Sequence, residues 1–431
     1  MAAGGAAVVV VIVGCLTNEG PAQNATGGET PIDRGAAAAA DVSPVSLSRP
    51  TDNRSAIPLD RNVRVRLCGR NGTQGFSLSI KARCTITETA THQVLDSDAV
   101  FLAAQRVTPA PLARGITIGA RTFEVDEISI APHEDAAIGI DGATYRGMLM
   151  IRRDGSKLLV NNVIDLEAYL PAVLAGELPA SFQPEAFEAM AVAARTYVLY
   201  QKRLYGGKRD FDVLPDERSQ VYADWTRVTP RAVAAVRATR GEICTLPASE
   251  GGSIFCTYYS SCCGGRSQPI WNVRRDEPSV EPLGGGVVCD GCKRAPHYRW
   301  GELRLSKAEI SRRVMERYPS LRKLGRVSRV ELIDSTPDGR MIRLRLVGTS
   351  GAADTLGAED FRLAVGGRQL KSTRCRMYDD GDGIVFYDGY GYGHGVGLCQ
   401  FGANSLARSG ADHLQILQHY FPGCQVRTCD Q

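Results

Sequence analysis

A single glutamate in an apolar setting is the first residue of this sequence that could do chemistry. Glu177 stands in A-G-E-L-P, at the expected end of a helix and next to Leu178 and Pro179, and the ten residues before it contain no lysine or arginine. A carboxyl group that is buried in such a setting has a raised pKa and keeps its proton near neutral pH. It could then act as the general acid that protonates a glycosidic oxygen. The alternative is an ordinary solvated glutamate at a helix end.

The second carboxyl group that an ordinary glycosidase needs is not evident nearby. Glu185 and Glu188 follow closely, but the first turn of a helix favours glutamate because of the helix dipole. We therefore interpret both as structural. A reaction with one carboxyl group stays open if the substrate supplies its own nucleophile.

Three polar residues that follow Glu177 are candidates for ligand contacts. Arg195 lies on an alanine-rich helix, where its planar fork indicates either an interior ion pair or a clamp for a ligand carboxylate. Gln220 and Tyr222, in S-Q-V-Y, have side chains of the kind that contact sugars.

Glycine occupies every second position from Gly389 to Gly397. On a strand, successive side chains point to opposite faces, so the residues between the glycines would share one face and leave the other bare. These residues are Tyr390, Tyr392, His394, Val396 and Leu398. Because glycine is tolerated where something approaches the backbone closely, the bare face would meet a partner. His394 has no companions at metal-ligand spacing, so we expect it to form hydrogen bonds or to be structural.

The cysteine content favours an oxidising compartment. Of the thirteen cysteines, all but Cys15 form an even set suited to disulfides. Cys68 with Cys84, and Cys424 with Cys429, are plausible local pairs.

Two further cysteine motifs allow two interpretations. The segments Y-Y-S-S-C-C-G-G-R-S and C-D-G-C contain Cys262, Cys263, Cys289 and Cys292. These four form either disulfides or a four-thiolate zinc site, and we favour disulfides outside the cytosol. A G-x-S-x-G nucleophile motif is absent, and so is a paired motif for a Cys-His protease.

Charge and the first residues indicate partners and compartment. A net charge of +4 over 431 residues, without a dense basic cluster, gives no case for a nucleic-acid partner.

Residues 1–15 end in an apolar run and Cys15, as a lipoprotein signal does, although no positive charge precedes the run. A buried N-terminal strand is the alternative. Residues 16–62 are rich in small and polar residues and predict a flexible linker. We expect an exported protein of the cell envelope (periplasm or outer face of the membrane), with a lipid on Cys15 as its membrane contact.

The elements that must position these residues predict an α+β fold. Residues 63–139 are β-rich, with alternating or β-branched runs between turn signals. Helical spacing occurs in L-E-A-Y-L-P-A-V-L-A-G-E-L-P, in 181–202 with Ser181 as a cap, and in 230–242 and 307–318. Strands before, between and after helices predict mixed sheets with embedded helices, not a doubly wound parallel sheet.

Two long segments resemble the SpoIID/LytB family, named after stage II sporulation protein D and amidase enhancer B. They are YLPAVLAGELPASFQPEAFEAMAVAARTYVLY and GYGYGHGVGLCQFGANSLARSGADHLQILQHYFPG. Between them, F-D-V-L-P-D-E-R-S-Q-V-Y-A-D-W, Y-Y-S-S-C-C-G-G-R-S and L-K-S-T-R-C-R-M follow in the order of the family. The resemblance implies a SpoIID-like catalytic domain over residues 140–430.

The resemblance implies a lytic transglycosylase, a lyase that cleaves peptidoglycan glycan strands between N-acetylmuramic acid (MurNAc) and N-acetylglucosamine (GlcNAc), preferring strands without stem peptides. The muramoyl C6 hydroxyl attacks its own anomeric carbon and forms 1,6-anhydromuramic acid, so one carboxyl group suffices. The essential glutamate of the family matches Glu177, and Arg195 would bind the lactyl carboxylate. Further substrate contacts would come from Gln220, Tyr222, Ser261, Tyr392, His394 and Gln400. The glycine segment would form a wall of the groove that faces Glu177, with either its aromatic row against the sugar faces or its bare face against the glycan.

Departures from the family pattern bear on metals. Some relatives hold zinc through Cys and His just before Gln-Val-Tyr, but residues 211–219 contain neither, so that site is not carried over. Ser260 stands where a histidine is common, and Tyr392 replaces a tryptophan. No cofactor is expected to be required, and a structural zinc is the less favoured option.

Two other functions stay open. One is a non-catalytic wall-binding enhancer of an N-acetylmuramoyl-L-alanine amidase, with that amidase as partner. The other is a carbohydrate-binding module, which would not need a carboxyl group in an apolar setting. A lipid anchor would suit wall remodelling in a bacterium that does not sporulate equally well.

Overall fold

The computed structural model describes residues 61–69, 71–111 and 114–429. These residues belong to one compact unit, Pro50–Gln431, and the other unit, Met1–Arg49, lies outside them. The expected signal with Cys15 and nearly all of the expected linker therefore fall outside the described residues. Helices and several sheets occur together, which confirms the α+β class. Within the described ranges, the helices are too short or too polar to cross a membrane.

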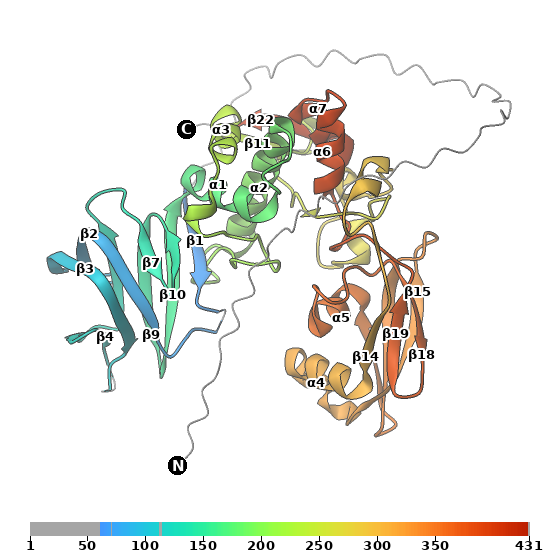
Figure 1. Cartoon of the computed structure of the whole chain (residues 1–431), viewed down its shortest axis with the longest axis horizontal. Coiled ribbons are helices and arrows are strands. Elements are labelled where there is room, and N and C mark those ends of the chain that lie inside the picture. Colours follow the sequence, from blue (N-terminus) through green and yellow to red (C-terminus); the bar gives the residue numbers. More distant parts are fainter. Residues whose placement is uncertain (1–60, 70, 112–113, 430–431) are drawn as a thin grey trace, which may run out of the picture. The chain divides into compact units, whose positions relative to one another are not determined.

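The N-terminal part is a ten-stranded antiparallel sheet (Figure 1). Its strand order is β1-β10-β9-β6-β2-β3-β4-β5, and β7 pairs with β2 and β8. Burial alternates as expected for strands: Phe76, Leu78 and Ile80 on β2 are buried. The bounds are β1 Asn62–Leu67, β2 Phe76–Glu88, β3 Val94–Pro109, β4 Ile116–Ile118, β5 Arg121–Phe123, β6 Glu127–Pro132, β7 Ile138–Ile140, β8 Ala143–Tyr145, β9 Met148–Asp154 and β10 Lys157–Asp165. The sheet thus continues across the expected boundary at 139/140.

Helices from two distant parts of the chain pack around α2. The bounds are α1 Leu166–Glu177, α2 Pro184–Tyr205, α3 Pro230–Ala238, α6 Gln400–Arg408 and α7 His413–Tyr420. In Figure 1, α6 and α7 near the C-terminus lie beside α2, and the contacts agree. The strands β11 (Glu242–Thr245) and β22 (Gln425–Thr428) pair beside them. The helix expected over 181–202 is confirmed, but its N-cap is Gln183 and not Ser181, because the fixed φ of Pro184 suits the first helical position.

A histidine joins α7 to this group of elements. His413 is the first residue of α7, and its ring nitrogens lie 3.3 Å from the Glu188 carboxylate on α2 and 3.0 Å from the Glu242 carboxylate on β11. Burial opposes the charge on His413, but these two carboxylates outweigh it and raise its pKa above the usual 6.5. The structural interpretation of Glu188 agrees with this contact.

The segment between β13 (Arg299–Trp300) and β20 (Gly389–Tyr390) has a hydrophobic core of its own. It contains the sheets β14-β19-β18 and β15-β16-β17. The bounds are β14 Leu303–Ser306, α4 Lys307–Arg317, β15 Val327–Ser335, β16 Met341–Gly348, β17 Ala353–Gly357, α5 Ala358–Val365, β18 Arg376–Asp379 and β19 Gly383–Tyr387. The helix expected over 307–318 is therefore confirmed. β13 and β20 pair with each other, so the chain enters and leaves this segment at the same place.

The expectation that the glycine-alternating segment is one strand is wrong. β20 ends at Tyr390 and the next strand, β21 (Leu398–Cys399), begins only at Leu398. The glycines between them all have positive φ values: Gly391 +84°, Gly393 +105°, Gly395 +72° and Gly397 +67°. Such a backbone is open to glycine and costly for other residues. The intervening side chains therefore do not line one face of a strand.

The close neighbours of these glycines belong to the protein itself. A Cβ on Gly397 would lie 2.1 Å from the carbonyl oxygen of Tyr258, and one on Gly391 would lie 2.7 Å from that of Cys262. A Cβ on Gly395 would meet the guanidinium of Arg340 at 2.8 Å. The bare backbone thus packs against other protein segments, which corrects the expectation that it faces the glycan.

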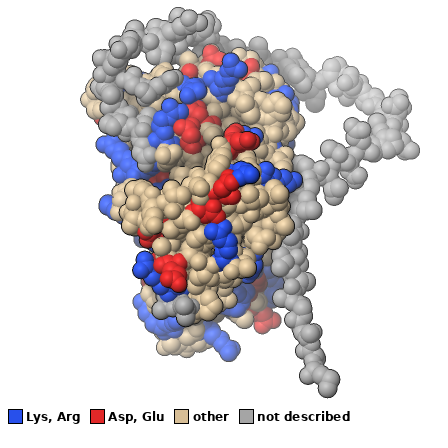
Figure 2. Space-filling view, turned by 90° about the vertical axis from the view of Figure 1, so that its left-hand side faces the viewer, with Lys and Arg blue, Asp and Glu red and all other residues tan. Residues whose placement is uncertain are grey.

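Charged side chains of both signs are interspersed on the face shown in Figure 2. Neither sign forms an extended field among the described residues visible there. This distribution agrees with the small net charge.

Candidate active site

Three donors from distant parts of the chain converge on the carboxyl group of Glu177, the last residue of α1. Its Oε1 accepts hydrogen bonds from the backbone N–H of Val221 at 2.8 Å and from the hydroxyl of Tyr259 at 3.3 Å. Its Oε2 accepts one from Nε2 of Gln400 at 3.0 Å. Glu177 and Gln400, which the sequence predicted to line one groove, are therefore in direct contact.

Local sequence explains how this cluster forms. α1 ends at Glu177 because Leu178 is extended and Pro179 follows. Gly176 has no Cβ, and a Cβ there would lie 2.3 Å from the carbonyl oxygen of Val221. Glycine at this position therefore lets the segment around Val221 approach the helix end, so that the backbone N–H reaches the carboxyl group.

Tyr259 and Gln400 arrive together through a short parallel pairing. In β12 (Tyr259–Ser260), Tyr259 is opposite Leu398 and Ser260 is opposite Cys399 of β21. Gln400 follows directly as the first residue of α6. Tyr259 was missed from the sequence, although it lies in the same cysteine-rich motif that supplied Ser261. Its hydroxyl stays protonated because burial and the nearby Glu177 charge raise its pKa well above the usual value.

Burial is the main influence on Glu177, and it raises the pKa of the carboxyl group. The hydrogen bonds from the three donors lower the pKa of Glu177, and the negative charge of the exposed Glu217 raises it further. The side chain is half-buried and not sealed. The Val221 N–H and the Gln400 Nε2 can only donate, so a protonated Glu177 can direct its own O–H to the Tyr259 hydroxyl or to a ligand. A carboxyl group in this setting is chemically able to act as a general acid.

Arg195 is an interior residue and not a ligand clamp. It is fully buried, and its Nε and Nη2 donate to the two carboxylate oxygens of Glu167, both at 2.8 Å. Its Nη1 donates to the carbonyl of Glu242 at 3.1 Å. These contacts occupy the planar fork, so the structure supports the interior ion pair of the two alternatives.

Gln220 and Tyr222 are also buried, which removes them from the expected sugar contacts. The amide of Gln220 accepts from the hydroxyl of Tyr169 at 3.1 Å and donates to the carbonyl of Ala194 at 3.2 Å. The hydroxyl of Tyr222 donates to Oδ1 of Asn162 at 2.8 Å. Both side chains hold the sheet and the helices together.

His394 ties the glycine segment to β12. Its Nδ1 accepts from the backbone N–H of Val396 at 3.0 Å, and it makes a further hydrogen bond with the backbone of Tyr259. Burial lowers its pKa from the usual 6.5 to about 4, so the ring is neutral at neutral pH. These contacts fit the expected hydrogen-bonding histidine and give it a positioning role.

Tyr392 and Ser261 are half-buried, and their roles as substrate contacts stay predictions. The ring of Tyr392 lies edge-on to His297, with the centroids 5.2 Å apart. The carbonyl of Ser261 accepts from the backbone N–H of Phe401, next to Gln400, at 3.1 Å.

All twelve cysteines in the described part of the chain are free thiols. The disulfides favoured from sequence, including the local pairs Cys68–Cys84 and Cys424–Cys429, are absent there. Three of the four cysteines considered for zinc, Cys263, Cys289 and Cys292, lie together, but their fourth neighbour is Cys399 and not Cys262. Cys399 was missed because it is distant in sequence from the other three.

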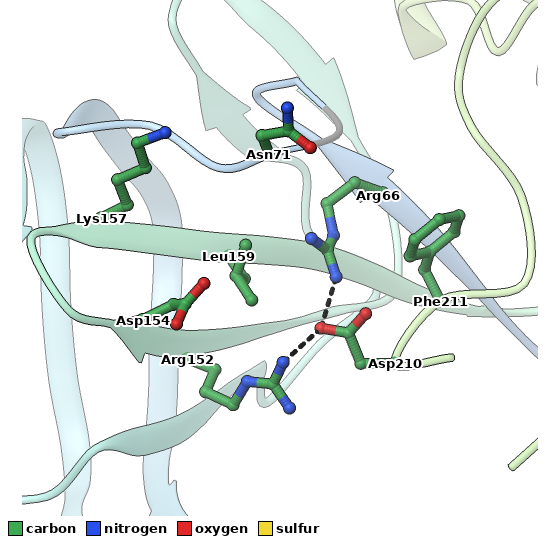
Figure 3. A pocket seen from close by; sticks show the side chains of 8 residues that line it. All are labelled: Arg66, Asn71, Arg152, Asp154, Lys157, Leu159, Asp210 and Phe211. Carbon is green, nitrogen blue, oxygen red and sulfur yellow. Dashed lines mark hydrogen bonds and ion pairs between the residues drawn. The ribbon is translucent and has the colours of Figure 1, made fainter. Parts of the chain in front are cut away.

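A hollow of about 450 Å³ lies away from Glu177, on the N-terminal sheet (Figure 3). In it, Asp210 accepts from Arg66 at 2.5 Å and from Arg152 at 2.7 Å, and the guanidinium of Arg66 lies over the ring of Phe211. Asn71, Asp154, Lys157 and Leu159 complete the lining. These internal ion pairs explain the charged lining without a ligand.

The sequence is similar to a family of known proteins. A sequence model described as "Stage II sporulation protein" (SpoIID) matches residues 154–246, which include Glu177. Stage II sporulation protein D of Bacillus subtilis is 25% identical over 283 residues, covering 62% of this chain and 76% of its own. The amidase enhancer of the same organism is 25% identical over 309 residues, 60% of this chain and 40% of its own. These matches support assignment of the chain to the SpoIID/LytB family.

A further relative is an uncharacterized protein of Brachyspira hyodysenteriae, 28% identical over 292 residues, which cover 67% of this chain and 73% of its own. The similarity to this family supports a role related to the cell wall. The relatives are named as a stage II sporulation protein D and an amidase enhancer, and the second name states one of the functions considered from the sequence.

Proposed function

We propose that this protein is a lytic transglycosylase that cleaves the MurNAc–GlcNAc bond of peptidoglycan glycan strands, with Glu177 as its acid and base. The observation that carries the proposal is the setting of Glu177. Its carboxyl group is half-buried, its pKa is raised by burial, and its three protein partners all donate to it. Such a group can give a proton to an oxygen of a ligand.

The proposed reaction needs no second carboxylate and no water. Protonated Glu177 gives its proton to the glycosidic oxygen, and the bond from this oxygen to the muramoyl C1 breaks. The C6 hydroxyl oxygen of the same MurNAc forms a bond to C1, and the Glu177 carboxylate takes the hydroxyl proton. The products are a GlcNAc end with a free hydroxyl and a 1,6-anhydromuramoyl end, and Glu177 is protonated again.

The donors around Glu177 suit this cycle. During the first step the carboxyl group becomes a carboxylate, and hydrogen bonds from Val221, Tyr259 and Gln400 stabilise that charge. They also fix the orientation of the group, because they come from three separate segments. Tyr259 remains a donor throughout, since its pKa is well above the usual value.

The test is mass spectrometry of products from peptide-stripped and peptide-bearing glycan strands. We expect anhydromuramoyl ends from stripped strands, and their loss in Glu177→Gln. Glu217→Gln is the matched control, because Glu217 is an exposed carboxylate whose charge acts on Glu177. That variant should still form anhydro ends. Reducing ends that contain an added water, lost in both variants, would indicate a two-carboxylate hydrolase and refute the proposal.

The second candidate is a wall-binding enhancer of an N-acetylmuramoyl-L-alanine amidase, which is favoured by the similarity to an amidase enhancer. It predicts that Glu177→Gln still binds strands and still stimulates the amidase. Absence of anhydro ends in the wild type, with binding intact, would favour this function.

Export to the cell envelope with a lipid on Cys15 belongs to both functions as a proposal. Radiolabelled palmitate supplied to growing cells should label the protein, and Cys15→Ser should abolish the label.

A further inference from the structure

Four buried cysteines from three separate segments gather beside the active site. Cys263 follows β12, Cys289 is the N-cap of a short 3-10 helix (Asp290–Arg294) that contains Cys292, and Cys399 is the last residue of β21. Their sulfur atoms all lie within 4.8 Å of one another, and each residue is at most 3% exposed. Thiol groups are not brought together in this way by ordinary apolar packing.

The sulfur distances match a tetrahedral metal site and not a disulfide. The Sγ atoms of Cys263 and Cys292 are 3.8 Å apart, whereas a disulfide bond is about 2.05 Å long. Sulfur atoms at the corners of a tetrahedron with Zn–S bonds of about 2.3 Å are about 3.8 Å apart. A mutual limit of 4.8 Å also leaves room for one ion and not for a multi-iron cluster.

The surroundings suit thiolates. The backbone N–H of Cys263 points to Sγ of Cys399 at 3.3 Å, and the hydroxyl of Tyr420 lies 3.1 Å from Sγ of Cys289. Gly402 on α6 makes room for this pair, because a Cβ there would lie 2.3 Å from Sγ of Cys289 and 2.0 Å from the Tyr420 oxygen. Outer-shell donors of this kind orient metal ligands.

A buried arginine supplies positive charge next to the cluster. Arg340 is 1% exposed, and its Nη2 donates to the carbonyl of Cys263 at 2.8 Å. Its Nε and Nη1 are buried without a hydrogen-bond partner among the described residues. Four thiolates around a divalent zinc have a net charge of −2, so a fixed guanidinium beside them lowers the cost of burying that charge.

We propose that Cys263, Cys289, Cys292 and Cys399 bind one structural zinc ion. Tetrahedral four-sulfur sites take zinc, and closed sites of this kind contribute to folding. The proposal does not depend on the proposed function. It does explain how Glu177 is supplied with donors, since Cys263 lies just beyond β12, which contains Tyr259, and Cys399 directly precedes Gln400. The ion would fasten these two segments to each other.

The first test is elemental analysis of the purified full chain without chelator treatment. We expect one zinc per chain. Replacement of the zinc by cobalt should give the intense thiolate-to-cobalt absorption of a four-sulfur site. Zinc at well below one per chain in protein purified under reducing conditions would overturn the proposal, as would one iron per chain or disulfides in the mass of the alkylated, unreduced protein.

The second test assigns the ligands. Cys289→Ser and Cys399→Ser should each lower retained zinc at least about tenfold after dialysis against a chelator. Cys375→Ser is the matched control, because Cys375 is buried in the separate core between β13 and β20 and is not one of the four cysteines, and this variant should keep one zinc. Equal loss in the control would refute the assignment. If the ligand variants do not fold, the zinc and cobalt results on the wild type still decide.

Two outcomes separate this proposal from the proposed function. Glu177→Gln should retain full zinc whatever its activity, since Glu177 is not a ligand. Chelation should increase hydrogen exchange in β12 and β21, measured without any substrate. Unchanged exchange in zinc-free protein would show that the ion does not fasten these strands.

Discussion

Replacing Arg195 by methionine distinguishes an interior ion pair from a substrate clamp. The side chain of Arg195 is fully buried, and the side chain of Glu167 is only 16% exposed. The variant would leave the Glu167 carboxylate unpaired in a mostly dry site and the carbonyl of Glu242 without this donor. Breaking a buried pair by removing one partner costs about 3–5 kcal/mol. Each kcal/mol lowers the melting temperature of a 150–250-residue unit by about 2–4 °C, and we expect a smaller fall per kcal/mol here because the compact unit, Pro50–Gln431, is larger.

The assay is urea and thermal unfolding followed by circular dichroism, together with the rate of strand cleavage well below the transition. The double variant Arg195→Met with Glu167→Met should recover most of the loss, because replacing both partners by apolar side chains is often neutral. Arg312→Met is the control: its pair with Glu316 is 3.7 Å long and both side chains are mostly exposed, so it should cost less than about 1 kcal/mol.

The result that would refute this reasoning is specific. If Arg195→Met unfolded within about 1 kcal/mol of the wild type and instead raised KM for glycan strands, Arg195 would be a ligand clamp. A stable protein with unchanged KM would contradict both interpretations.

Three other substitutions test particular contacts. Gln400→Leu removes a donor that favours ionised Glu177, so the pKa of Glu177 should rise further and the alkaline limb of the pH–rate profile should move to higher pH; an unmoved limb would contradict the assignment. His413→Gln should lose stability mainly at low pH in urea unfolding, because a raised pKa makes the protonated His413 contribute fully below about pH 6.5 and less as pH rises through the folded value. Equal loss at all pH values would count against it. Gly397→Ala should cost more than about 1–2 kcal/mol, since φ is +67° and the Cβ would collide with the carbonyl of Tyr258; a wild-type melting temperature would disprove the close packing.

The sequence predicted the elements whose patterns depend on local spacing. The apolar stripe of α2 and the helix at 307–318 were recognisable because one face of each helix packs against a core. The apolar surroundings of Glu177 were also readable, since Leu178 and Pro179 are its sequence neighbours.

Contacts between segments that are distant in the sequence could not be predicted from local spacing. Alternating glycine looks the same in sequence whether it forms a strand or a run of positive φ values, and only the crowding around Gly391–Gly397 distinguishes them. Cys399 joins the other cysteines through the pairing of β12 with β21, which no spacing predicts. Whether Arg195 bound a ligand or formed an ion pair with Glu167 depended on its burial in the fold. The sequence alone therefore allowed both alternatives.

The glycine segment also has a consequence for the order of folding. Glycine loses more conformational freedom on folding than any other residue, so residues 389–397 cannot hold their shape before their neighbours are in place. Their neighbours are distant in sequence, as the pairing of Tyr259 with Leu398 illustrates, and closing such long loops is slow. Gln400 follows this segment directly, so we expect it to reach Glu177 late in folding. The hydrogen bond from Gln400 to Glu177 should therefore form among the last steps of folding. A partly folded chain would contain Glu177 without this donor.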